Sequence, residues 1–319
     1  MQKTPLFLFF ILTLTACQKS EFTNESESGN SVVKYSVAFG QSDDTKGTLI
    51  NTSGIEASLS SFHQTVGTFS ATAFRDGAAE PLFSQSVSWS DADSKWVGSP
   101  VAYWPQSSVL NFFASANMPS ISVATASCTS SAVTLNYLAV PANVTDQKDI
   151  LLGCYQGDGG KTGTADIHFK HPLTSFVFKR GSHNIDEDMI SIKQISISGI
   201  AASGSVAMDV TGNLSAWSVS GYTGMATLGD GTSDLAVNST TGVIGGTNGT
   251  FIIIPQNAAS NNITVSVKAQ TLDGSKTYTT TIATGDFLAG KTYEFSIYPN
   301  ATRWLEIAYK CPWDSEVTL

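Results

Sequence analysis

Cys17 is the residue of this sequence whose surroundings most clearly indicate chemistry. It follows residues 14–16 (LTA), and an apolar residue and two small residues before a cysteine form the cleavage pattern of a bacterial lipoprotein signal peptide. Lys3 supplies the positive charge at the start of the signal peptide. Residues 6–14 form an apolar run that is too short to span a bilayer. We therefore predict that residues 1–16 are a cleaved signal peptide. The thiol of Cys17 then carries the lipid that holds the exported chain at a membrane.

Three further cysteines, Cys128, Cys154 and Cys311, would meet an oxidising environment in an exported chain. Cys128 and Cys154 lie in the same half of the chain and are the more plausible disulfide, whose loop closure would stabilise the fold by ~3 kcal/mol. Three buried free thiols fit the sequence about equally well. Cys311 is the residue that a disulfide would leave unpaired. The chain has no CxxC pair, so a zinc ribbon or a thioredoxin-type site is not supported.

One segment matches the phosphate-binding pattern GxxxxGK[ST]: residues 285–292 (GDFLAGKT). That loop binds phosphate when it opens into a helix, whose free N–H groups meet the anion. Here the following residues, 293–298, alternate as a strand and run into Pro299. We therefore predict a turn into a strand and no nucleotide cofactor.

The histidines do not form a recognisable catalytic or metal-binding set. His168 and His171 have HxxH spacing, but residues three apart on a strand face opposite sides, so we expect surface or turn histidines. The sequence contains neither HExxH nor GxSxG. We predict no catalytic, cofactor-binding or metal-binding residues. A pair of catalytic carboxylates distant in sequence, as in a glycan hydrolase, stays as the least favoured alternative.

A short stretch contains four large aromatic residues: Trp89, Trp96, Tyr103 and Trp104. Exposed aromatic rings can bind sugars, but such side chains in a β-rich protein more often fill a core or an interface between domains. We favour packing over a sugar-binding platform.

The elements that would position these residues are strands. Residues 263–270 and 293–298 alternate between apolar and polar types, and the apolar run 251–254 is stopped by Pro255, as in a strand buried on both faces. Glycine, asparagine and proline recur between such runs. The sequence therefore predicts an all-β protein, with β-sandwiches as the expected architecture.

Charge excludes one class of partner. Without Lys3 the mature chain has 16 basic and 26 acidic residues, a net charge of −10, and it has no basic stripe. This balance argues against nucleic-acid binding and against electrostatic docking to anionic lipid. The lipid on Cys17 would have to supply the anchoring.

Composition also suggests where the chain divides. Residues 17–32 are polar and read as a flexible tether. Residues 157–165 (GDGGKTGTA) contain no large apolar side chain and give the best boundary, so we expect an N-terminal domain over 33–160 and a C-terminal domain over 161–319. A second break at 299–302 precedes a final short strand.

Several motifs in order along the chain resemble the fimbrillin family of Bacteroidetes, the two-domain lipoprotein pilins and their minor subunits. Each motif is short, but the set covers most of the mature chain and accompanies the lipidation pattern. The motifs are 103–105 (YWP) before 110–114 (LNFFA), 149–152 (DILL), 171–174 (HPLT) before 176–178 (FVF), 251–256 (FIIIPQ) and 288–293 (LAGKTY).

The resemblance implies two β-sandwich domains of transthyretin-like topology and transport to the outer-membrane surface. It also implies that a trypsin-like protease removes the first strand, and that the groove accepts a strand from a neighbouring fimbrial subunit. The matching cut falls after Lys46, where the family usually carries arginine. Residues 33–39 alternate as a removable strand should. An ordinary exposed turn at Lys46 is an equal alternative.

The donor strand expected from the resemblance lies near the C-terminus, with Trp304, Leu305, Ile307 and Tyr309 as its residues. Leu305, Ile307 and Tyr309 would share one face. A plain closing strand of the second domain fits this segment nearly as well.

Together these observations predict a non-catalytic, lipid-anchored protein of the cell surface that acts as a fimbrial subunit or a fimbria-associated adhesin. Its expected partners are other fimbrial subunits, joined by strand exchange, and outer-membrane lipid, with a host glycan or protein as a further ligand. The first alternative is a surface lipoprotein that binds host glycans or proteins and does not polymerise. The second is the glycan hydrolase described above.

Overall fold

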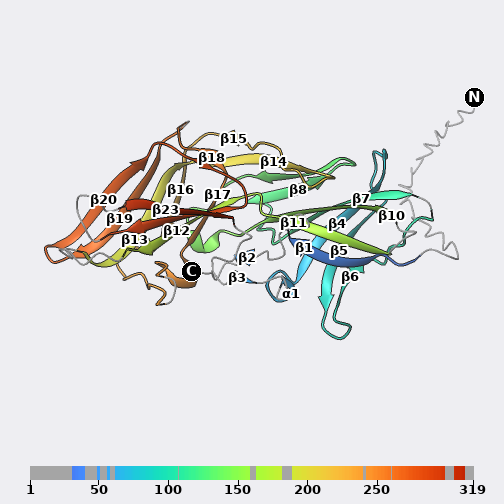
Figure 1. Cartoon of the computed structure of the whole chain (residues 1–319), viewed down its shortest axis with the longest axis horizontal. Helices are drawn as coiled ribbons and strands as arrows, with labels where there is room; N and C mark the ends of the chain where they lie inside the picture. The colour runs from blue at the N-terminus through green and yellow to red at the C-terminus, as the bar shows by residue number, and fades with distance from the viewer. Residues whose placement is uncertain are drawn as a thin grey trace, which may run out of the picture.

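The computed structural model describes residues 31–39, 49–50, 56–57, 62–106, 108–158, 163–181, 189–239, 242–259, 261–298 and 305–312. Strands make up most of this part of the chain, so the predicted all-β class is confirmed (Figure 1). Its one α-helix is the single turn α1 (Phe62–Thr65). No helix among these residues is long and apolar enough to cross a membrane. Cys17, Lys46 and Trp304 lie outside the described residues.

The N-terminal part forms a closed barrel rather than the expected sandwich. Alternate residues of its strands point inward and make a core rich in phenylalanine and tryptophan, including Phe69, Phe112 and Trp96. In order around the barrel the strands are β1 (Lys34–Phe39), β11 (Thr164–Lys170), β10 (Leu151–Asp158), β7 (Val109–Ala116), β4 (Thr68–Arg75), β5 (Phe83–Ser90) and β6 (Lys95–Ser99).

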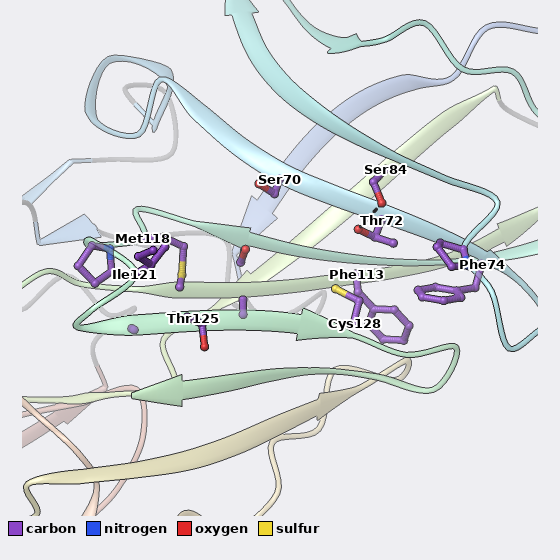
Figure 2. Close-up of a pocket in the computed structure, with 14 residues that line it drawn as sticks. Ser70, Thr72, Phe74, Ser84, Phe113, Met118, Ile121, Thr125 and Cys128 are labelled. Carbon is purple, nitrogen blue, oxygen red and sulfur yellow. Dashed lines mark hydrogen bonds between the residues drawn. The ribbon is translucent and has the colours of Figure 1, made fainter. Parts of the chain in front are cut away.

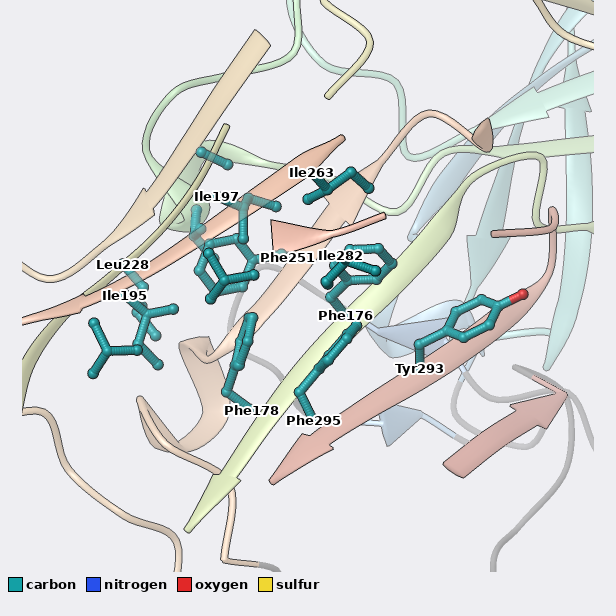
Figure 3. Packing of buried hydrophobic residues seen from close by; sticks show 14 of the residues in the cluster. Phe176, Phe178, Ile195, Ile197, Leu228, Phe251, Ile263, Ile282, Tyr293 and Phe295 are labelled. Atoms are coloured by element: carbon teal, nitrogen blue, oxygen red, sulfur yellow. The ribbon is translucent and has the colours of Figure 1, made fainter. Parts of the chain in front are cut away.

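The C-terminal part places two four-stranded sheets around one core. Phe176, Phe178 and Phe295 of the first sheet meet Ile195 and Ile197 of the second (Figure 3). The first sheet is β17 (Thr250–Ile253), β12 (Thr174–Arg180), β22 (Lys291–Ile297) and β23 (Leu305–Pro312). The second is β16 (Gly224–Leu228), β13 (Met189–Ile200), β19 (Ile263–Thr271) and β20 (Gly274–Ile282).

A third sheet combines strands from both halves of the chain. Its members, in order, are β15 (Ser218–Ser220), β14 (Ser203–Asp209), β9 (Ala132–Tyr137) and β8 (Ala124–Cys128). Val133, Leu135 and Tyr137 of β9 pack with Phe113 and Leu152, the outward-facing residues of barrel strands β7 and β10. In Figure 1 this sheet lies between the barrel and the C-terminal sheets.

The strands on either side of the expected boundary near residue 160 pair with each other. Residues 157–165 join β10 to β11, which are neighbours in the barrel, so the barrel continues to Lys170. The shared sheet also links strands before and after this point. Composition alone does not distinguish a segment between paired strands from a linker between domains.

The remaining elements are short. Two ribbons pair β2 (Leu49–Ile50) with β3 (Glu56–Ala57) and β18 (Gln256–Asn257) with β21 (Asp286–Phe287). Single 3-10 turns, η2 (Val144–Asp146) and η3 (Gly246–Asn248), lie between strands.

Candidate functional site

Strand β1 closes the barrel, and its two neighbours hold it unequally. It pairs in parallel with β11 from Lys34↔Thr164 to Phe39↔Phe169, but with β6 only at Tyr35↔Trp96. Just before β1, the N–H of Val33 donates to the carbonyl of Ala102 at 2.9 Å. Without β1, the described residues leave β11 and β6 as two open edges.

The inward face of β1 belongs to the barrel core. Val33 and Tyr35 are buried, and Val37 packs against the same cluster. The Tyr35 ring meets Phe69 and Phe112 edge-on, with ring centroids 6.0 and 6.2 Å away. Such contacts stabilise a core beyond simple burial, so β1 contributes to folding as well as to closure.

One polar side chain, Gln85 of β5, lies in this core. The Tyr35 hydroxyl donates to Gln85 Oε1, and Gln85 Nε2 donates to the Pro100 carbonyl. Burial raises the pKa of Tyr35, so its hydroxyl stays protonated and able to donate. Gly98 gives Gln85 its room, because a Cβ there would lie 2.6 Å from Gln85 Nε2. Gln85 is therefore held in place to accept a hydrogen bond from the hydroxyl of Tyr35.

The outward face of β1 contacts an acidic residue of β11. The Ser36 hydroxyl donates to Asp166 Oδ1 at 2.8 Å. His168 Nε2 lies 3.4 Å from Asp166 Oδ2, and both of these side chains are partly exposed. In this register of β1 on β11, Tyr35 contacts Gln85 on the inward face and Ser36 contacts Asp166 on the outward face.

The predicted donor segment is found in β23. Within the described residues, β23 is an edge strand, antiparallel to β22. Leu305 and Ile307 pair with Ile297 and Phe295, and after a register shift Tyr309 pairs with Glu294. Its present place is that of a closing strand, and its role as a donor stays a prediction.

Cys128 and Cys154 are both free thiols, so the expected disulfide between them is not formed. Cys128 belongs to the shared sheet and Cys154 to the barrel, and burial raises the pKa of both thiols. Each side chain fills space between these two layers, beside different neighbours. The alternative of free thiols fits these two residues, of which Cys154 is buried and Cys128 is partly buried.

The HxxH histidines have different aspartate partners. His168 lies beside Asp166, as described above. His171 was expected at the surface or in a turn, but it is fully buried with Nδ1 2.9 Å from Asp149 Oδ1. The described residues contain no group of three histidine, cysteine or acidic side chains placed to hold a metal ion.

Two other expectations are confirmed. Residues 285–292 lead into strand β22 and not into a helix, so the loop lacks the helix N-terminus that a phosphate site needs. Trp96 and Trp104 are buried in the barrel core, and Trp89 stacks on His63 with ring centroids 4.3 Å apart. The tryptophans of this stretch are packing residues, whereas Tyr103, the fourth aromatic residue of the group, is exposed.

A cleft of about 510 Å³ opens where β8 lies over the outer face of the barrel. Figure 2 shows Ser70, Thr72 and Ser84 of the barrel facing it, with Cys128 of β8 at one side. Met118 and Ile121 form its apolar end. Sequence reasoning missed this cleft, because single hydroxyl residues on separate strands carry no pattern that predicts their meeting.

Comparison with known proteins places this architecture in a family. A family model described as fimbrillin-like matches residues 62–310, which include six of the seven barrel strands and the C-terminal sheets. The chain belongs to the fimbrillin-like family. The recognition of this family from sequence motifs is therefore confirmed. A search of curated proteins finds no match.

Two solved structures share the fold of this fimbrillin-like chain, and a third is similar at a lower TM-score. A candidate cell adhesion protein from Bacteroides uniformis is 12% identical with a TM-score of 0.55, over 90% of this chain and 99% of its own. Another from Bacteroides ovatus is 10% identical with a TM-score of 0.53, over 89% and 98%. The tip fimbrial protein Mfa3 from Porphyromonas gingivalis is 9% identical with a TM-score of 0.46, over 88% and 100%.

Proposed function

We propose that this fimbrillin-like protein is a non-catalytic fimbrial subunit, made as a lipid-anchored precursor at the outer-membrane surface, that assembles by strand exchange in its barrel. The observation that carries the proposal is the place of β1. It is the first strand of the described chain, it closes the barrel, and Lys46 follows it in the sequence. A cut after Lys46 would break the covalent link between β1 and the other barrel strands, all of which follow Lys46 in the sequence.

Loss of β1 would leave a groove that favours occupation by another strand. The β11 edge from Thr164 to Phe169 would lose its backbone partner, and the aromatic core behind Tyr35 would meet water. Unpaired strand edges and exposed apolar surface both favour the addition of a strand. A strand from a neighbouring subunit restores the backbone hydrogen bonds and covers the core again.

The lipid on Cys17 anchors the chain at the outer-membrane surface, where the subunits assemble. Residues 18–30 give the folded part enough chain to stand away from the membrane. A Cys17→Ala variant should lose both lipid labelling and surface display. Unchanged surface display of that variant would contradict the anchoring.

The decisive experiment on assembly is the intact mass and the N-terminal sequence of the protein taken from its native cell surface, with an unheated gel of the same sample. A chain that starts at Gly47, together with a ladder of heat-sensitive oligomers, is the expected result. A Lys46→Ala variant should stay uncut and monomeric, whereas Lys46→Arg should be cut and form the ladder. A monomer that retains a lipidated Cys17 would contradict assembly by this subunit.

A second function is favoured by the cleft between β8 and the barrel. Its uncharged lining of hydroxyl groups beside apolar side chains could bind a neutral ligand of a host surface, as an adhesin that does not polymerise would. Binding of a host glycan or protein by an uncut monomer would support this function. Abolition of that binding by Thr72→Val, with Ser86→Ala on the neighbouring strand as control, would assign it to the cleft.

A further inference from the structure

Strand β8 has a free edge within the described part of the chain. It is the last strand of the shared sheet and pairs there with β9 alone. In this ladder Val123 lies opposite Leu138, whose N–H donates to the Val123 carbonyl at 2.8 Å. Residues of an antiparallel strand alternate between those that bond the partner strand and those whose backbone groups point away from it. The N–H and carbonyl groups of Ala126 and Cys128 therefore point to the free edge.

The free edge of β8 opens onto the cleft of about 510 Å³ described above. Figure 2 shows Thr125 and Cys128 along β8 at one side of this cleft. Ala124, Ala126 and Cys128 line it, and so does Thr125, whose side chain lies on the opposite face of the sheet. A cleft that reaches residues of both faces of a strand lies at the edge of that strand. The five residues of β8 offer this edge over about 17 Å.

The lining of the cleft is uncharged. Thr72 of β4 and Ser84 of β5 form part of its floor, with their hydroxyl oxygens 3.1 Å apart. Met118 and Ile121 form one end, and Ile121 is 83% exposed. None of the residues that line the cleft carries a charge, although the chain has a net charge of −9. A ligand with charged groups would lose hydration here without gaining an ionic partner, so the lining favours a neutral ligand with one apolar group.

Another strand edge of the same fold is covered by a side chain. Strand β17 ends the first C-terminal sheet, and the N–H of Ile252 on this strand donates to Oε1 of the buried Gln147 at 2.7 Å. Proteins block strand edges in such ways because an open edge pairs readily with another strand. Among the described residues, no side chain covers the N–H of Ala126 in this way. The edge of β8 is thus available for pairing.

An extended polypeptide matches both the edge and the lining. Its own N–H and carbonyl groups repeat every two residues, at about 6.8 Å, which is the spacing of the free groups of Ala126 and Cys128. A glycan has hydroxyl groups but lacks this repeat of donors and acceptors along one edge. A polypeptide can also direct an apolar side chain toward Met118 and Ile121.

We propose that the free edge of β8 binds an extended segment of a partner polypeptide, which lies in the cleft as a fifth strand of the shared sheet. The side chains of this segment that face the floor are uncharged, and one apolar side chain contacts Met118 and Ile121. Backbone hydrogen bonds then supply affinity, and the floor supplies specificity. The inference rests on the ligand-binding function proposed above for the cleft and names its ligand class. It does not depend on strand exchange at β1.

The probe for this site is a phage-displayed library of random seven-residue peptides, selected on the intact, uncut protein. Selected peptides are synthesised with blocked ends, and their affinity is measured by calorimetry. Ala126→Pro should weaken their binding at least about tenfold, because proline has no N–H to donate and its ring occupies the edge. Proline is tolerated at an edge position whose N–H points away from the ladder, so this variant should fold.

The matched control makes the same change at the other end of the shared sheet. The N–H of Ala202 donates to the carbonyl of Gly221, so by the same alternation the N–H of Ser218 points to the free edge of β15. Ser218→Pro should therefore fold and bind the peptides as the wild type does. Ser127→Pro removes an N–H that bonds β9 and should unfold at a lower denaturant concentration than Ala126→Pro.

A second measurement changes the peptide and leaves the protein intact, so it stands even if Ala126→Pro does not fold. Methyl groups are placed on the backbone nitrogens of the peptide, one at a time. Binding should weaken at every second position only, because every second N–H of an added strand faces β8. Equal losses at neighbouring positions would contradict strand addition.

The remaining outcomes separate this inference from the function on which it rests. A library without binders, or binders whose affinity Ala126→Pro leaves unchanged, would overturn it. A host glycan whose binding is lost in Thr72→Val but kept in Ala126→Pro would overturn the polypeptide ligand and leave the cleft function intact. Self-association of the uncut protein that Ala126→Pro abolishes would replace the partner with a second copy. Failure of peptides and glycans alike to bind would remove the cleft function as well.

Discussion

Asp149 Oδ1 lies 2.9 Å from His171 Nδ1, and both side chains are completely buried. Asp149 comes two residues before β10, and His171 follows β11 directly, so the pair ties together the ends of two neighbouring barrel strands. Next to it, Trp217 Nε1 donates to the Pro172 carbonyl at 2.8 Å, which joins the loop after β14 to the same point. Two motifs that are separate in the sequence, 149–152 and 171–174, thus form one contact where the chain leaves the barrel for β12.

Loss of this contact should weaken the fold far more than loss of its exposed counterpart. We expect His171→Ala to lower the free energy of unfolding by about 3 kcal/mol or more, because it leaves the Asp149 carboxylate buried without that partner. His168→Ala removes the same side-chain type from a partly exposed pair with Asp166 and should cost less than about 1 kcal/mol. Denaturant unfolding of both variants measures the difference. Similar losses would contradict the structural role of the buried pair.

Gly98 should be required for the attachment of β1. Gly98→Ala would place its Cβ within 2.6 Å of Gln85 Nε2 and would force Gln85 away from Tyr35 and Pro100. We expect amide hydrogens of β1 to exchange at least about tenfold faster, because a displaced buried amide costs roughly 1–3 kcal/mol. Val97→Ala changes an exposed neighbour on β6 and should leave the exchange of β1 unchanged. Slow exchange of the β1 amide hydrogens in both variants would contradict this prediction.

Both thiols should be intact, and that of Cys154 should be inaccessible in the folded protein. Because Cys128 and Cys154 are free, alkylation of the unfolded chain without reductant should modify both. In the folded state, we expect Cys154 to react much more slowly, since it is buried and its pKa is raised. Intact mass after timed alkylation gives both results. A mass showing a disulfide between these two residues would contradict the structure.

Cys154 should also make stability depend on pH in mildly alkaline solution. Burial raises the pKa of its thiol from 9.0 to about 11; Lys170 opposes the rise and Asp209 adds to it. Between these pH values the unfolded chain loses the proton and the folded chain keeps it, so the free energy of unfolding falls as pH rises above 9. The slope is at most about 1.4 kcal/mol per pH unit.

The matched variant for this pH effect is Cys154→Ala. It should flatten the decline measured between pH 8.5 and 10, although it loses some stability at every pH through the smaller side chain. Cys128→Ala should keep the part of the pH-dependent decline in stability that Cys154 causes. A decline of unchanged steepness in Cys154→Ala would show that other groups cause it.

Sequence reasoning succeeded where the signal is local. Alternation over 263–270 and 293–298 predicted strands correctly, because every second side chain of a strand faces the core. The same logic identified residues 285–292 as a turn into a strand. The ordered motifs identified the family, which the match over residues 62–310 confirms. The lipidation of Cys17 and the cut after Lys46 depend on short local patterns as well, and they stay predictions.

Sequence reasoning failed where strands distant in the chain had to be paired. Nothing in the composition of residues 157–165 shows that the strands on either side of them pair, and only the structure shows the pairing of β10 with β11. The shared sheet, the buried pair of Asp149 and His171, and the meeting of Tyr35 with Gln85 all join residues far apart in sequence. Local periodicity determines which face of a strand is buried. Which strands pair depends on how the apolar faces of all the strands can be buried together. Only the tertiary structure shows that arrangement.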